Sequence, residues 1–217
     1  MKGLSNLLCL MPMLLSIGSI GNKGEQLTSS TRQPIPVFIE KKNLTPCNDY
    51  VCERIINARL RSLLLSKIFD FLVCEDITVV LSDEAFANAR VVGDTHFLNN
   101  RIWEITLNTN ALQQASQEYI AATIIHELLH VYLMQSTETD HDIMSRQYIK
   151  PMAVALMSSG YAISYERAQA LAWGGLQNTR AWHEMRLIDR VLRTYQAQEI
   201  LNTNYFYATG KMGVPCP

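Results

Sequence analysis

Residues 119–134, YIAATIIHELLHVYLM, decide how this chain folds. The stretch is apolar on every side of a helix, which predicts a helix buried in the interior and not one with a solvated face. Three of its side chains are nevertheless strongly polar, namely His126, Glu127 and His130. Burying such groups costs several kcal/mol unless each has a partner. We therefore expect a buried helix over residues 116–135 whose polar groups share a function.

The spacing of the two histidines supplies those partners. His126 and His130 are four residues apart, so they lie one turn apart on one helix face and can converge on a metal ion. Glu127 lies beside them, placed to reach a metal-bound water. This H-E-x-x-H pattern predicts a Zn2+ cofactor, hydrolysis of peptide or protein substrates, and Glu127 as the catalytic base. The alternative is two hydrogen-bonded core histidines and a buried, ion-paired glutamate.

A catalytic zinc takes a third protein ligand and keeps one position open. We expect His141 as this ligand, because imidazole suits zinc and the ten residues after His130 let the chain turn back to the metal. Asp140 is the second candidate and Glu138 the third. Asp142 is expected to hydrogen-bond a liganding imidazole or to cap a helix.

The motif HELLH followed by HDIMSR at residues 141–146 resembles the SprT-like zinc metallopeptidases. The resemblance covers roughly residues 50–160 and implies three zinc ligands and one catalytic residue: His126, His130, His141 and Glu127. SprT-like proteins are intracellular and linked to DNA, often with a zinc ribbon. This chain has no C-x-x-C pair. The segment 170–182, ALAWGGLQNTRAW, is similar to uncharacterised bacterial relatives and implies no chemistry.

Composition bears on the partners. The 217 residues are 48% apolar and 18% charged, which suits a globular domain and excludes a disordered chain. Lysine and arginine total 19 against 20 acidic residues, so the basic excess of a nucleic-acid-binding protein is missing. We expect a peptide or protein substrate, no nucleic acid and no stable membrane span in the mature chain. The oligomeric state stays open.

The N-terminus predicts export. Residues 1–21 combine Lys2, an apolar stretch and small residues that suit cleavage, as in a secretory signal peptide. Residues 22–46 are polar in their first part and are expected to form a linker or arm. A single metallopeptidase domain then covers residues 47–217, and the protein is expected to be secreted or periplasmic.

The cysteines agree with export. Removal of residues 1–21 leaves four, an even number that suits two disulfides in an oxidising compartment. The short spacing of Cys47 and Cys52 favours a bond between them, which would leave Cys74 with Cys216. The other two connectivities stay open.

The fold class predicted is α+β, with an N-terminal helix, a small and mostly antiparallel sheet, the H-E-x-x-H helix and a helical C-terminal half. The first helix starts near Asn48 and carries its apolar residues between positions 51 and 64. Strands are expected at residues 77–81, 89–92 and 102–107, the last one a half-buried or edge strand lining the cleft. Further helices are expected at residues 142–158, 164–172 and 180–201.

The remaining candidates are weaker. Tyr148 and Tyr165 are conceivable donors to an oxyanion, although a core position is the simpler interpretation of each. His96 is expected at the surface, and Trp173 with Trp182 in the core. His183 precedes Glu184, but no histidine follows at position 187, so it forms no second motif. Two other functions stay open: an exported binding module that keeps a zinc site, and an intracellular SprT-type protease.

Overall fold

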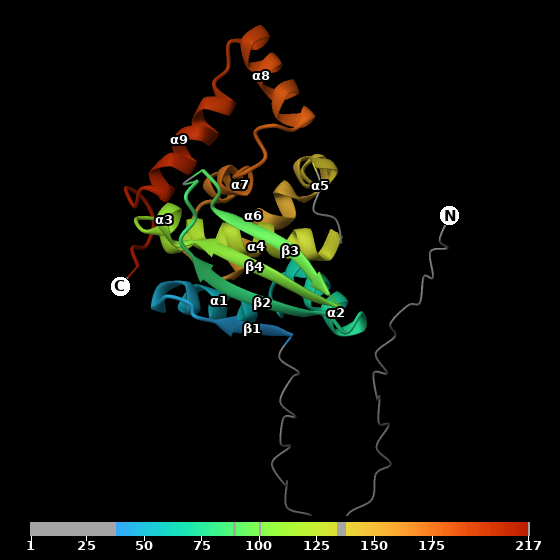
Figure 1. Ribbon diagram of the computed structural model, residues 1–217. Coiled ribbons are helices and arrows are strands. Elements are labelled where there is room, and N and C mark those ends of the chain that lie inside the picture. Colours follow the sequence, from blue (N-terminus) through green and yellow to red (C-terminus); the bar gives the residue numbers. More distant parts are fainter. Residues whose placement is uncertain (1–37, 89, 100, 134–137, 217) are drawn as a thin grey trace, which may run out of the picture. The chain divides into compact units, whose positions relative to one another are not determined.

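A four-stranded sheet forms one side of the structure, a computed structural model that describes residues 38–88, 90–99, 101–133 and 138–216 (Figure 1). In order across the sheet the strands are β1 (Ile39–Lys42), β2 (Thr78–Glu84), β4 (Ile102–Asn108) and β3 (Gly93–Asn99). β1, β2 and β4 run parallel, and only β3 pairs antiparallel, with β4. The expected mostly antiparallel sheet is therefore wrong. Two helices connect β1 to β2, a crossover long enough for parallel pairing.

The strand at residues 102–107 is confirmed, but it is not an edge. β4 lies between β2 and β3, with Trp103, Ile105 and Leu107 buried as the alternation predicts. The strand expected at 89–92 is replaced by β3, which starts at Gly93 and forms the edge. Glycine and aspartate at the start of β3 are poor strand formers, so pairing with β4 overrides their local preference.

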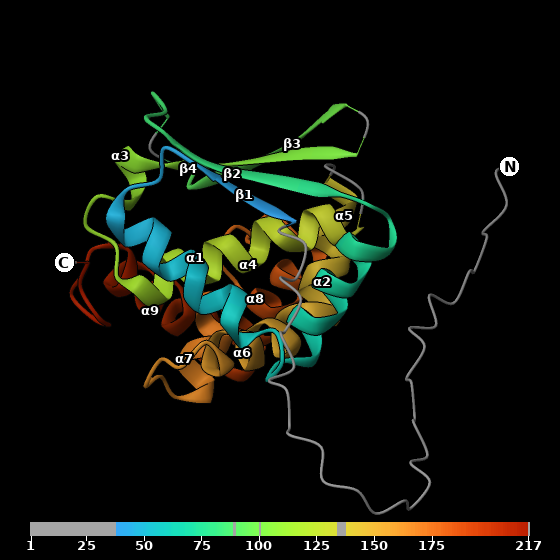
Figure 2. The ribbon, with the colours of Figure 1, turned by 90° about the horizontal axis from the view of Figure 1, so that it is seen from below.

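Helices cover one face of this sheet (Figure 2). The helices next to it are α1 (Pro46–Ala58), α2 (Leu63–Cys74) and α4 (Gln117–Leu133), and a second layer holds α6 (Ile149–Ser158), α7 (Tyr165–Ala172) and α9 (Gln196–Ala208). α4 contacts β3 and β4 above it and α6, α7 and α9 below it. This central position explains why its sequence is apolar on every side.

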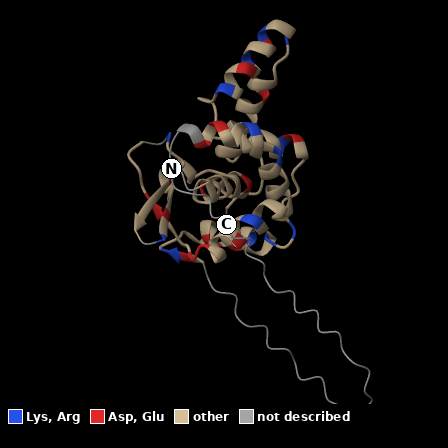
Figure 3. Cartoon of the chain, turned by 90° about the vertical axis from the view of Figure 1, so that its right-hand side faces the viewer, with Lys and Arg blue, Asp and Glu red and all other residues tan. Residues whose placement is uncertain are grey.

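Two predicted helices are each interrupted. The helix expected from Asn48 divides into α1 and α2, because the Ser62 hydroxyl accepts the Leu65 N–H and starts a new helix. The helix expected at 180–201 divides into α8 (Arg180–Leu192) and α9 at Arg193, whose φ is 55°. α8 projects from the rest of the domain (Figures 1 and 3).

The segment after α4 is also more divided than predicted. Residues 142–158 belong to α5 (Glu138–Ile143), a π-helix η1 (Met144–Tyr148) and α6. A short helix α3 (Thr109–Leu112) connects β4 to α4. α4 starts as predicted, since the Ser116 hydroxyl accepts the Tyr119 N–H.

The disulfide pairing differs from the prediction. Cys47 at the start of α1 is bonded to Cys216, with 5.5 Å between their Cα atoms, and Cys52 is a buried thiol. The bond holds the C-terminal tail against the start of α4. There the Val214 N–H donates to the Glu118 carboxylate at 2.8 Å.

The N-terminal predictions fall mostly outside the described residues. The signal peptide at 1–21 lies there, as does most of the linker at 22–46. The end of that linker is corrected, because β1 and the first residue of α1 occupy positions from 39 to 46. In the part of the chain that the structure describes, no helix is long and apolar enough to cross a membrane.

Breaking the disulfide should destabilise the domain markedly. The bonded cysteines are 169 residues apart, and closing so long a loop stabilises by about 5 kcal/mol in the chain-entropy model. We expect Cys47→Ser and Cys216→Ser each to lower the Tm by roughly 10 °C or more. The double variant should fall no further, since either change breaks the same bond. Thermal unfolding of oxidised protein measures this, and an unchanged Tm would contradict the pairing.

Candidate metal centre

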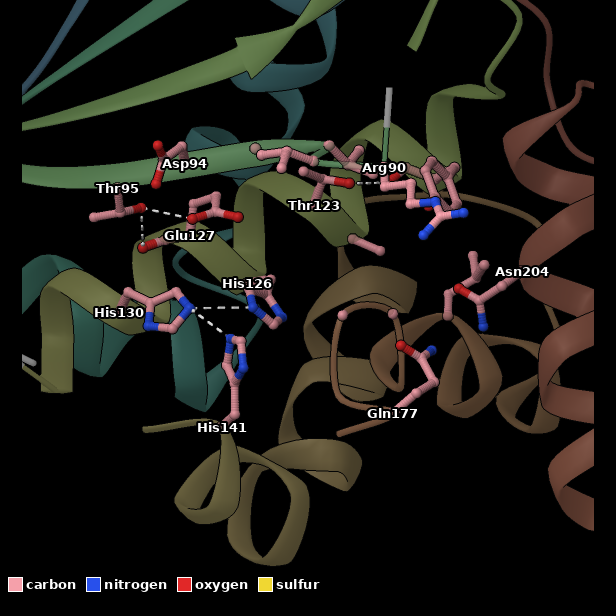
Figure 4. A pocket seen from close by; sticks show the side chains of 18 of the residues that line it. Arg90, Asp94, Thr95, Thr123, His126, Glu127, His130, His141, Gln177 and Asn204 are labelled. Atoms are coloured by element: carbon pink, nitrogen blue, oxygen red, sulfur yellow. Dashed lines mark hydrogen bonds between the residues drawn. The ribbon is translucent and has the colours of Figure 1, made fainter. Parts of the chain in front are cut away.

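Three imidazoles from two elements meet at one point (Figure 4). His126 and His130 come from adjacent turns of α4, and His141 comes from α5. The Nε2 atom of His130 lies 3.2 Å from Nε2 of His126 and 3.2 Å from Nε2 of His141. All three ligand atoms lie within 4.8 Å of one another, close enough to bind one metal ion. The structure thus brings together the three histidines that the sequence predicts.

The environment keeps His126 in the form that binds metal. His126 and His130 are each 8% exposed. Burial, and then the neighbouring imidazoles of His130 and His141, hold the pKa of His126 well below its usual value. A ring that stays neutral offers a lone pair to a cation, since metal ligands must be deprotonated.

Asp140 does not reach this point and lies behind it. Its Oδ2 atom is 3.4 Å from Nδ1 of His130, on the side of the ring away from the other histidines. Asp140 is fully buried, and its Oδ1 atom has no partner among the described residues. A carboxylate in this place orients the ring and makes it a better ligand. Asp140 as the third ligand is therefore wrong, and the side chain of Glu138 lies outside the described residues.

Neighbours of His141 anchor the short helix that carries it. Met144, three residues further, is fully buried at the start of the π-helix. Asp142 accepts the backbone N–H of Arg180 at 3.0 Å and so caps α8. Asp142 was expected to support a liganding imidazole or to cap its own helix, and it caps α8 instead. His141 is thereby fixed to α4 on one side and to α8 on the other.

The Glu127 side chain lies on the side of the histidine cluster that faces β3 (Figure 4). Its Oε2 atom accepts a hydrogen bond of 2.6 Å from the Thr95 hydroxyl on β3. Burial raises the pKa of Glu127 to about 7; the Thr95 hydrogen bond opposes this and the Asp94 carboxylate adds to it. A Cβ atom at Gly93 would lie only 2.9 Å from Glu127 Oε1. Glycine at position 93 therefore lets β3 approach the carboxylate.

A cavity of about 540 Å³ opens over these residues. One wall is a single face of α4, where Tyr119, Thr123, His126 and His130 follow one another at spacings of four, three and four. The opposite rim is formed by residues 90–95. Tyr119 and Thr123 were missed by the sequence analysis, although their helical spacing from the histidines would have identified them.

The third wall comes from a segment to which no chemistry was assigned. Gly174, Gly175, Gln177 and Asn178, all within residues 170–182, line the cavity. Gly175 has φ of +77°, and a Cβ there would lie 3.3 Å from Cε1 of His126. The glycine pair thus closes the backbone over the imidazole, and Asn204 of α9 lines the same wall.

The weaker candidates divide cleanly. Tyr148 and Tyr165 do not line the cavity. His96 is exposed as predicted and pairs with Asp94 at 2.7 Å, and His183 is also exposed. Trp173 and Trp182 are buried with ring centroids 5.6 Å apart, which confirms the core prediction. β3, not β4, is the strand whose residues line the cavity.

No protein-family model, no curated protein and no solved structure matches this chain.

Ionisation of Glu127 should make stability depend on pH in the metal-free protein. Its pKa is about 7 when folded against a reference of 4.5, so the folded state holds the proton more tightly. This stabilisation is complete below about pH 4.5 and is lost as the pH rises through about 7. Glu127→Gln should therefore raise the free energy of unfolding by on the order of 3 kcal/mol near pH 8. It should change little near pH 4.

Urea unfolding of the chelator-treated protein at both pH values measures the effect. The exposed Glu75→Gln is the matched control and should change stability at neither pH. An equal effect of Glu127→Gln at both pH values would contradict the raised pKa.

Zinc affinity should distinguish a metal ligand from a residue that only supports one. His141→Ala removes a donor atom and should abolish tight binding of added Zn2+. Asp140→Ala removes only the group behind His130 and should weaken binding by about 10–100-fold. Competition with a chromogenic chelator measures both, with the exposed His96→Ala as a control that should bind normally. Weaker binding by the Asp140 variant than by the His141 variant would contradict the ligand assignment.

Proposed function

We propose that this protein is a zinc-dependent metallopeptidase. The observation that carries the proposal is the meeting of three Nε2 atoms at the floor of a cavity that Glu127 also lines. Three nitrogen ligands with an accessible side are what a catalytic zinc requires. The glutamate next to the first histidine has the position of a general base in the H-E-x-x-H pattern.

The donor set fits zinc in distance and in charge. A tetrahedral zinc with nitrogen ligands at about 2.0–2.1 Å separates those nitrogens by about 3.3 Å. The two closest separations here are 3.2 Å. Among the described residues, the fully buried Asp140 carboxylate contacts His130, and a cation held by that ring would compensate its charge.

A zinc ion held by His126, His130 and His141 would supply a Lewis acid that lowers the pKa of a water and polarises the scissile carbonyl. Glu127 takes the proton of the attacking water and delivers it to the leaving amine. Thr95 holds the Glu127 carboxylate by its hydroxyl, and Gly93 leaves the space that this carboxylate needs. Asp140 fixes the ring of His130.

The substrate would lie along β3. This strand is at the edge of the described sheet and three of its residues, Gly93, Asp94 and Thr95, line the cavity. An extended peptide can add to such an edge through backbone hydrogen bonds. The cleft strand of the proposal is thus β3 in place of the one expected at residues 102–107.

Export and the SprT-like resemblance belong to the same proposal. The Cys47–Cys216 bond is compatible with an oxidising compartment, outside the cytoplasm. The resemblance rests on the metal motif and on His141 at a short helix, without the DNA link of intracellular SprT-type proteases. The competing function is an exported binding module that keeps zinc without catalysis.

Substitution of the base separates these functions. Glu127→Gln should retain Zn2+, because it changes no ligand, and should lower the rate of proteolysis of a denatured protein on the order of a thousandfold. The exposed Glu75→Gln, a matched loss of one carboxylate, should keep full activity. Zinc content is measured by metal analysis, and cleavage by fluorescence of a quenched, labelled protein.

The contrary results are equally specific. Zinc-loaded wild type that cleaves neither a denatured protein nor a peptide library would favour the binding module. Purified protein that takes up no transition metal would remove both functions.

A further inference from the structure

α8 carries an apolar face that no described element covers. The C-terminal half of α8 and Tyr195, three residues beyond its end, carry large apolar side chains that are 53–72% exposed. We define these side chains as the α8 patch: Leu187, Ile188, Val191, Leu192 and Tyr195. Trp182, near the start of α8, is the one residue of this helix that is buried. The rest of α8 projects beyond the domain (Figure 1).

The opposite face of the same helix is basic. Arg186 and Arg190 are four residues apart, so they share a side of the helix, and Arg193 follows directly after its end. At 100° per residue the mean direction of Arg186 and Arg190 lies roughly 150° from that of the patch residues within α8, Leu187, Ile188, Val191 and Leu192. All three are exposed, and the ion pairs recorded on α8 involve Arg180 and Glu184 at its other end. Basic positions mark this projecting helix in Figure 3.

We propose that α8 binds the surface of an anionic lipid bilayer, with the α8 patch in the interfacial region and the arginines on the opposite face, within the range of the headgroup charge. A short helix with one apolar and one arginine-rich face is typical of helices that lie in a membrane interface. The helix is about 10–12 Å wide, which is comparable to the Debye length of about 8–10 Å. Salt therefore screens only part of the attraction between the anionic surface and arginines on the far face of the helix.

A second copy of the chain fits this face less well. A stable protein interface takes about 20–30 residues from each partner. The α8 patch has five large apolar side chains on one helix that stands away from the body.

The lipid-binding helix starts at the rim of the metal centre. Arg180, its first residue, is two positions after Asn178 of the cavity wall, and its N–H is held by Asp142, the neighbour of His141. The helix is about 20 Å long. Binding through its far half would therefore hold the cavity near the lipid surface.

Vesicle sedimentation tests the proposal with the purified full chain. We expect wild type to sediment with vesicles of phosphatidylglycerol and phosphatidylcholine in equal parts, and far less with phosphatidylcholine alone. Leu187→Ser with Val191→Ser should lower the partition coefficient on the order of tenfold or more. Arg186→Gln with Arg190→Gln should lower it about fivefold for each arginine.

Matched controls remove the same chemistry elsewhere. Leu60→Ser with Leu63→Ser changes two leucines that are 87% and 73% exposed near the start of α2. Arg61→Gln with Lys67→Gln removes two exposed charges from the same region. Both controls should bind like wild type, and circular dichroism should show equal folding of all variants.

Three results would overturn the proposal. The first is wild type that stays in solution with anionic vesicles. The second is binding that both α8 variants retain, which would place the contact elsewhere in the chain. The third is a concentration-dependent dimer in light scattering that the α8 serines abolish while vesicles are not bound, since the occupant would then be a second copy.

Discussion

The structure depends on enclosing α4, with its three polar groups, between a sheet and a second layer of helices. β3 and β4 cover it on one side and α6, α7 and α9 on the other, so most of its residues are shielded from solvent. Such a helix tolerates ionisable groups only where other groups compensate them. His126, Glu127 and His130 face the cavity, where the two histidines meet His141 and Glu127 meets Thr95. The free energy needed to bury the polar face is thus offset at one place, and that place is the candidate metal centre.

Local sequence patterns predicted the elements better than their connections. The buried helix, the strand at β4 and the α+β class follow from periodicity, which depends on neighbours along the chain. The direction of the sheet does not, because parallel pairing results from the crossover through α1 and α2. The helix breaks at Ser62 and Arg193 were missed for a related reason. At each of them a capping contact or a left-handed residue interrupts an apolar pattern that continues across it.

The site shows the same division. The two histidines and the glutamate are fixed by spacing within one helix, and His141 by its chemistry. The supporting groups come from elsewhere: Gly93 gives space to Glu127, Gly175 lies against His126, and Asp140 stands behind a ring when it had been a candidate ligand. A glycine in a sequence does not say which side chain will lie against it. Cysteine pairing failed likewise, since proximity along the chain favoured Cys52 while the tail brought Cys216 to Cys47.

The contact of the tail with α4 has a consequence for the order of assembly. The first turn of α4 donates the Gln117 N–H to Val214 and receives the Val214 N–H on Glu118, across nearly a hundred residues. All three histidines precede the tail in the chain, so a growing polypeptide has them well before Val214 emerges. The helix that carries two of them is nevertheless left with open polar groups at its first turn until then. The disulfide between Cys47 and Cys216 therefore forms late, and it fixes the tail to a domain that is otherwise closed by hydrogen bonds. The redox conditions of the compartment then set when this bond forms.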